Sequence, residues 1–166
     1  MAMATSGSAV VTLPTDTQIL ITREFAAPRH LVYQAWTTPE LIRRWWAGER
    51  GTVTLAEVDL RVGGKWRYVM EVDDSFEVGF HGEFREIVPN ERIVNTEVFE
   101  GMPDAEDAAA VNTVTFAEAG GGTTLSILVQ HACQEHRDAH INSGMEGGMQ
   151  EAMDRLEQVA ISLAKS

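Results

Sequence analysis

The sequence has 166 residues, of which 44% are hydrophobic and 23% are charged, and this composition excludes an intrinsically disordered or low-complexity chain. The length fits one domain with one core. The 13 Lys and Arg residues are outnumbered by 25 Asp and Glu residues, so the net charge is −12 and nucleic acid is not an expected partner.

The N-terminal part is predicted to be a flexible arm followed by one strand and two short helices. Residues 1–16 offer little apolar surface to offset the entropy of ordering them, so we predict an arm over 1–16 and a single domain over 17–166. Residues 18–25 have the β-branched content of a strand. Pro28 and Pro39 then each favour the first turn of a helix, and apolar residues follow both at helical spacing.

From residue 52 onward the apolar residues alternate with a period of two, which is typical of strands. Six further strands are predicted, at 52–60, 65–73, 76–88, 92–100, 110–118 and 123–130. Short turn-forming segments separate most of them, so each strand is expected to run antiparallel to the one before. The connection 101–107 is longer and acidic, and we expect an exposed loop there.

The C-terminal segment returns to helical periodicity. Apolar residues recur every three or four positions from Met145 to Leu163, which predicts a long amphipathic helix. Its other face is expected to contact water, and it carries Glu146, Gln150, Glu151, Asp154, Glu157 and Gln158. The whole pattern predicts an α+β fold in which a seven-stranded, curved antiparallel sheet wraps around this helix. A helix packed over a twisted sheet contacts it well at one end and leaves a cavity at the other.

Several segments together resemble one superfamily of proteins. They are ITREFAAPRHLVYQAW, TPELIRRWW, GGKWR, HGEFREIVPNERIV and GMEGGMQEAMDRLEQV. The set is similar to the SRPBCC or START-like superfamily, and within it to the branch of the heat-shock-protein-90 ATPase activator homologue, of the C-terminal domain type. The similarity covers about residues 18 to 165.

The resemblance implies a helix-grip fold of the START and Bet v kind, with a hydrophobic pocket for a small ligand. It does not imply one reaction, because a fold does not determine a function. Members of the superfamily include chaperone co-activators, binders of aromatic or lipid-like molecules, polyketide cyclases and a sacrificial antibiotic-resistance protein. The eukaryotic co-activator has a separate chaperone-binding domain for which this chain has no room, so a chaperone role is not favoured.

The candidate ligand-binding residues are aromatic and methionine side chains on the faces expected to line this pocket, together with two polar residues. Aromatic rings offer broad apolar contact and methionine adapts to ligands of irregular shape, although a fully packed core would use the same residue types. The set is Trp36, Trp45, Trp66, Tyr68, Met70, Phe80, Phe84, Asn95, Glu97, Met145, Met149 and Met153.

The sequence leaves open which face of the strand 92–100 points inward. If Ile93, Asn95, Glu97 and Phe99 face the interior, Glu97 orients a ligand or acts as an acid or base. If the alternate residues face the interior, Glu97 lies in water.

The segment 131–140 raises the question of a metal site. It holds Cys133 with His131, His136 and His140, and the last two have a spacing that suits zinc binding on a helix. The glutamate of the HExxH motif is absent, so we favour a solvent-exposed helix and predict no metal and no cofactor. No nucleophile motif is present either, and no catalytic residue is assigned.

We therefore predict a binding protein for a small hydrophobic molecule. The alternatives are a pocket enzyme of the cyclase or hydrolase type and a chaperone ATPase co-activator, and a homodimer is also compatible with the sequence. The single cysteine fits a cytoplasmic location, where thiols stay reduced. No stretch approaches the roughly 18 to 20 apolar residues that cross a bilayer, and no secretion signal is apparent, so we expect neither a membrane span nor export.

Overall fold

A computed structural model of the chain describes residues 9–48, 51–72, 76–100 and 108–165. The elements follow one another as β1 (Val10–Thr12), β2 (Gln18–Phe25), α1 (Arg29–Thr37), α2 (Pro39–Trp45), β3 (Thr52–Val58), β4 (Lys65–Val72), β5 (Phe76–Val88), β6 (Arg92–Phe99), β7 (Ala110–Ala119), β8 (Gly122–Gln130), α3 (Gln134–Ile141) and α4 (Met145–Ala164). No helix in these ranges is both long and apolar enough to span a membrane.

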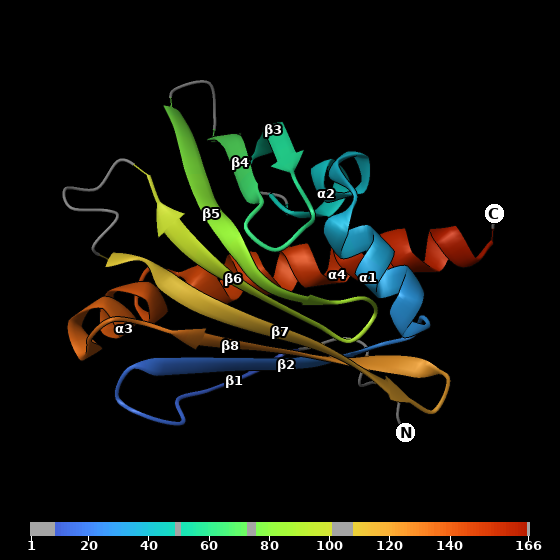
Figure 1. Cartoon of the computed structure of the whole chain (residues 1–166). Coiled ribbons are helices and arrows are strands. Elements are labelled where there is room, and N and C mark those ends of the chain that lie inside the picture. Colours follow the sequence, from blue (N-terminus) through green and yellow to red (C-terminus); the bar gives the residue numbers. More distant parts are fainter. Residues whose placement is uncertain (1–8, 49–50, 73–75, 101–107, 166) are drawn as a thin grey trace.

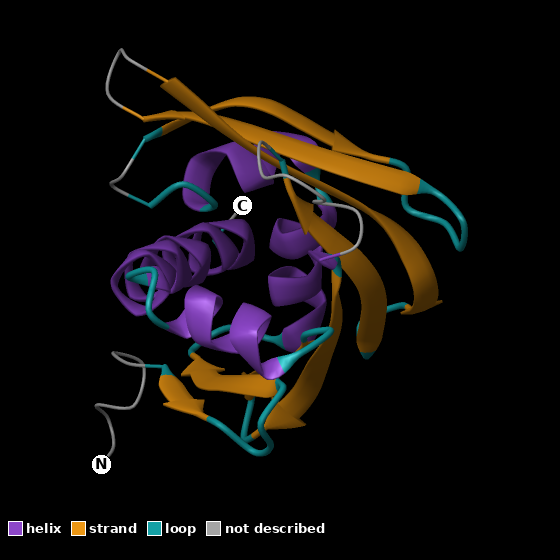
Figure 2. Cartoon of the chain, turned by 90° about the vertical axis from the view of Figure 1, so that its left-hand side faces the viewer, coloured by secondary structure: helices purple, strands orange, loops and turns teal. Residues whose placement is uncertain are grey.

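The strands form one antiparallel sheet in the order β1-β2-β8-β7-β6-β5-β4-β3 (Figure 1). Strands β3 to β8 make a meander, because consecutive strands pair with each other. The strand β2 pairs with β8, so the first long strand of the chain lies beside the last. Figure 2 shows the sheet bending around the helices. This arrangement confirms the predicted α+β helix-grip fold.

The sheet has eight strands rather than the predicted seven. The additional strand is β1, which lies within the segment 1–16 and pairs with β2 from Val10↔Thr22 to Thr12↔Leu20. Three residues carry too little apolar patterning to predict a strand, and β1 is stable because the open edge of β2 supplies its hydrogen-bonding partners. The rest of the predicted arm before residue 9, and the predicted acidic loop at 101–107, lie outside the described residues.

The helix α4 buries one face, as its periodicity predicts. Leu156 and Ala160 are completely buried, and Met153 and Val159 are nearly so. The backbone of α4 packs closest to α1 and α2 (Figure 1). The interior of the sheet therefore meets side chains of α4 rather than its backbone.

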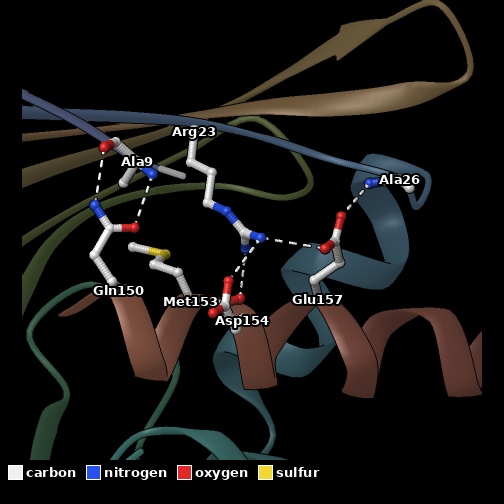
Figure 3. Close-up of polar contacts among 7 residues, drawn as sticks. All are labelled: Ala9, Arg23, Ala26, Gln150, Met153, Asp154 and Glu157. Atoms are coloured by element: carbon white, nitrogen blue, oxygen red, sulfur yellow. Dashed lines mark hydrogen bonds and ion pairs between the residues drawn. The ribbon is translucent and has the colours of Figure 1, made fainter. Parts of the chain in front are cut away.

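One buried arginine fixes α4 to the strand β2 (Figure 3). The guanidinium of Arg23 donates from Nη1 to the Met153 carbonyl oxygen at 2.6 Å, and from Nη2 to Asp154 Oδ1 at 3.0 Å and Glu157 Oε1 at 3.2 Å. The other carboxylate oxygen of Glu157 accepts a hydrogen bond from the Ala26 backbone N–H at 2.9 Å. Since these partners belong to three turns of α4 and to β2, the cluster sets the position of the helix along the sheet.

The prediction that Glu157 faces water is wrong. Its side chain is only 7% exposed, because β2 passes over this part of α4 and supplies Arg23 as a partner. One turn earlier, Asp154 does face solvent, with 59% of its side chain exposed. Near the start of the helix, the Gln150 amide pairs with both backbone groups of Ala9, at 2.9 Å each (Figure 3). The N-terminal strands therefore hold α4 along its polar side.

Candidate functional site

A cavity of about 600 Å³ lies between the concave face of the sheet and α4. Its wall includes residues from every strand from β2 to β8 and from all four helices. The volume is within the range of about 300 to 1,000 Å³ that is typical of small-molecule sites. The lining is mostly aliphatic, aromatic and methionine side chains, so the cavity suits an apolar ligand.

The twelve predicted ligand-binding residues all lie along the wall of this one cavity. The helices α1 and α2 and the strands β4, β5 and β6 contribute nine of them, and α4 contributes the three methionines; the set is Trp36, Trp45, Trp66, Tyr68, Met70, Phe80, Phe84, Asn95, Glu97, Met145, Met149 and Met153. The period-two and helical patterns were sufficient to find them, because they identify the inward face of each element. That these residues bind a ligand stays a prediction.

Packed aromatic rings form one part of the wall. The Trp46 ring meets Tyr68 edge to face at a centroid distance of 5.4 Å, and Phe80 at 5.2 Å. Trp66 lies 4.7 Å from Tyr68. The indole N–H of Trp45 donates to a backbone carbonyl of α1, at 2.9 Å from its oxygen. These contacts hold the rings in place without a ligand, which lowers the entropic cost of binding one.

The position of Trp66 depends on a glycine in the neighbouring strand. Its Nε1 donates to the Thr96 carbonyl oxygen at 3.1 Å, so the indole of a β4 residue crosses β5 to reach β6. The crossing point is Gly82, which pairs with Trp66 in the sheet. A Cβ atom at Gly82 would overlap the Thr96 carbonyl oxygen and lie 2.6 Å from Trp66 Nε1. Only glycine fits here.

The strand β6 turns Ile93, Asn95, Glu97 and Phe99 toward the cavity, which answers the question that the sequence left open. Glu97 is half-buried, and its Oε1 accepts a hydrogen bond from Asn112 Nδ2 at 3.1 Å. Sequence reasoning missed Asn112, although a polar residue between apolar inward residues of β7 was a usable signal.

The hydroxyl of Tyr68 responds to Glu97. Burial raises the pKa of Tyr68, and the nearby negative charge of Glu97 raises it further. The phenol is therefore a neutral hydrogen-bond donor at neutral pH. It has no hydrogen-bonding partner among the described residues. Tyr68 and Glu97 together give the apolar cavity a polar region.

Three histidines line the end of the cavity that α3 covers. They are His131, His136 and His140, and Nε2 of His131 lies 3.0 Å from Nδ1 of His140. The expectation of a solvent-exposed helix is therefore wrong for this face of α3. The signal was the spacing of His136 and His140, which places both on one face of a helix. Within the ranges that the structure describes, no three His, Cys, Asp or Glu side chains are arranged to hold a metal ion.

Burial keeps two of these histidines neutral. It lowers the pKa of His131 to about 4, and the neighbouring His140, His136 and Arg137 lower it further. Burial also lowers the pKa of His140, against the opposite effect of Glu97. Near neutral pH these two rings are hydrogen-bonding groups without charge.

The free energy of unfolding is expected to fall as the pH drops from 6.5 toward 4. The unfolded chain binds a proton at the ordinary histidine pKa of 6.5, whereas folded His131 stays neutral down to about 4, so acid favours the unfolded state in this window. We expect a loss of about 1 to 2 kcal/mol, less than the full linkage value because the ring is partly solvated. Urea unfolding at pH 7, 5.5 and 4.5 measures it.

The variant His131→Gln should remove most of this pH dependence. The exposed His30 offers a matched control, since His30→Gln should leave the dependence unchanged. Arg67 and His81 lower the pKa of Glu100 to about 2, so that carboxylate weakens the fold only below its ordinary value of 4.5, outside the window. Parallel curves for the wild type and His131→Gln would contradict the assignment.

Comparison with known proteins identifies relatives of the whole domain. The model of the family described as Activator of Hsp90 ATPase homolog 1-like protein matches residues 26–160. A solved structure from Rhodobacter sphaeroides superposes with a TM-score of 0.85 at 24% sequence identity, over 96% of this chain and 99% of that one. A structure from Nitrosomonas europaea gives 0.81 at 21% identity, over 93% and 100%. These two likenesses show the shared fold.

A third solved structure is described as an AHSA1-like protein, from Aeromonas hydrophila. It superposes with a TM-score of 0.68 at 25% identity, over 90% of this chain and 95% of that one. No curated protein matches the chain. The fold and the family are therefore shared along nearly the full length of these relatives.

Proposed function

The chain belongs to the Activator of Hsp90 ATPase homolog 1-like family, and from this membership and the cavity we propose that it binds a small hydrophobic molecule, aromatic or lipid-like, between the sheet and α4. The observation that carries the proposal is the unfilled volume of about 600 Å³ inside a single domain. Protein interiors are normally close-packed, so a space of this size gives up many van der Waals contacts. A bound apolar molecule would supply them.

The side chains around the cavity support the same proposal. Met145 and Met149 on α4 are half-buried and face the aromatic wall of the sheet. Methionine side chains are flexible and polarisable, so they adjust to the shape of a ligand. The hydrogen-bonded Trp45 and Trp66 hold the opposite walls open. One adaptable wall and one rigid wall suit a site for ligands that are apolar and variable in shape.

The dye N-phenyl-1-naphthylamine is expected to bind the folded protein saturably. It is uncharged at pH 7 and fluoresces in apolar surroundings, and it should quench tryptophan fluorescence because three of the four tryptophans predicted or found at the site are held in fixed contacts around the cavity. The variant Met149→Ala should weaken dye binding about fivefold, as expected for losing roughly 1 kcal/mol of apolar contact. Its unfolding free energy should change less, because Met149 is only half-buried.

The variant Phe76→Ala is the matched control. Phe76 is 54% exposed and lies outside the cavity wall, so its loss should leave dye affinity unchanged. The proposal fails if neither the dye nor a library of apolar molecules binds saturably to the folded wild-type protein.

A further inference from the structure

The cavity wall carries one formal charge. Among the described residues that line it, Glu97 is the only Asp, Glu, Lys or Arg. No described lysine or arginine forms an ion pair with it, and its recorded polar contact is the neutral Asn112 amide. His131 and His140 do not offset the charge, because burial keeps both neutral near pH 7. The cavity therefore presents one uncompensated carboxylate to whatever enters it.

Hydrogen bonding leaves part of this carboxylate available. Oε1 accepts the Asn112 N–H at 3.1 Å, and Oε2 has no hydrogen-bonding partner among the described residues. A carboxylate oxygen in an apolar site is costly unless a donor reaches it. The amide of Asn112 is a positioning group, because it orients Glu97 without neutralising its charge.

Aromatic rings border the carboxylate. Trp66 donates its indole N–H to the carbonyl of Thr96, the residue that precedes Glu97. The charge of Glu97 reaches Tyr68, whose ring lies 4.7 Å from that of Trp66. The faces of such rings attract cations through their quadrupoles. A carboxylate beside aromatic rings in a closed apolar space favours a positive group on the ligand.

We propose that the cavity selects hydrophobic amines, with the protonated amino group paired to Glu97 and the apolar part against the aromatic and methionine walls. This inference rests on the proposed function and names its ligand class. A hydroxyl head can donate to Glu97 but gains no ion pair, and a carboxylate head would place a second negative charge in the same space. The expected order of affinity is amine, then alcohol, then carboxylate.

The test uses three ligands with one tail, namely octylamine, 1-octanol and octanoate, each displacing N-phenyl-1-naphthylamine at pH 7. Octylamine should bind the wild-type protein at least about tenfold more tightly than octanoate. In Glu97→Gln the two affinities should come within about threefold of each other, while that for 1-octanol changes little. The exposed Glu83 on β5 provides the control, because Glu83→Gln removes the same charge outside the cavity and should leave the order unchanged.

The outcomes separate the two proposals. If the dye does not bind the wild-type protein, the proposed function fails. If the dye binds but octanoate competes as well as octylamine, the inference about the amine fails and the binding function stands. The wild-type series alone gives this result, even where Glu97→Gln does not fold. An amine preference that survives Glu97→Gln also overturns the assignment, because it would come from the overall net charge of −12.

Discussion

The variant Arg23→Met is expected to lower the free energy of unfolding by about 3 to 5 kcal/mol, the usual cost of removing one partner from a buried ion pair. The Arg23 and Glu157 side chains are 1% and 7% exposed, so the remaining carboxylate would be left without its cation in an apolar setting. The Met153 carbonyl would lose its 2.6 Å contact as well. Urea unfolding of the two proteins at pH 7 measures the difference.

Two further variants test the physical reason. Adding Glu157→Gln to Arg23→Met should recover part of the loss, because the amide removes the unpaired charge and still accepts from Ala26. Arg61 pairs with Asp59 at the surface, where the side chains are 71% and 50% exposed, so Arg61→Met should cost less than about 1 kcal/mol. Equal effects of Arg23→Met and Arg61→Met would show that the buried cluster does not anchor α4.

The variant Gly82→Ala is expected to destabilise the protein by about 3 kcal/mol, at the upper end for overpacking. Its new methyl group would overlap the Thr96 carbonyl and approach Trp66 Nε1 to 2.6 Å, so either β6 or the indole must move. The indole forms part of the cavity wall, and its displacement should also shift the tryptophan emission spectrum and weaken dye binding.

The variant Trp66→Phe separates the clash from the lost hydrogen bond. It removes the N–H donor to the Thr96 carbonyl without adding atoms at Gly82, and should cost about 1 to 3 kcal/mol. The exposed Gly147 lies inside α4, where Gly147→Ala should instead stabilise by about 0.5 to 1 kcal/mol. If Gly82→Ala unfolds at the same denaturant concentration as the wild type, the crossing of β5 by Trp66 places no constraint on that strand.

Periodicity was enough to predict most of the fold. The alternation of apolar residues from residue 52 onward gave the six later strands to within two residues at each end, and helical spacing gave the start of α4 at Met145. The same patterns identified the residues of the cavity wall, because an inward face is a local property of each element.

Long-range contacts explain what periodicity could not predict. The acidic side of α4 was assigned to water as a whole, but Glu157 meets Arg23, which lies 134 residues away in the chain. The strand β1 depends on the free edge of β2, and the histidines of α3 depend on where that helix meets the sheet. In each case the partner lies in another element, and no local pattern encodes it. A chaperone partner, a homodimer, an enzymatic role and a cytoplasmic location stay predictions.

The pairing of β2 with β8 has a consequence for biosynthesis. Gln18 on β2 hydrogen-bonds to Gln130 on β8, and Arg23 on β2 needs carboxylates of α4, which follows β8. A ribosome delivers the meander from β3 to β7 before either partner exists, so the nascent β2 waits with one edge unpaired and an arginine without its anions. Contacts so distant along the chain form slowly. The domain therefore closes its core only when translation is nearly complete, and until then its apolar concave face is accessible to other chains.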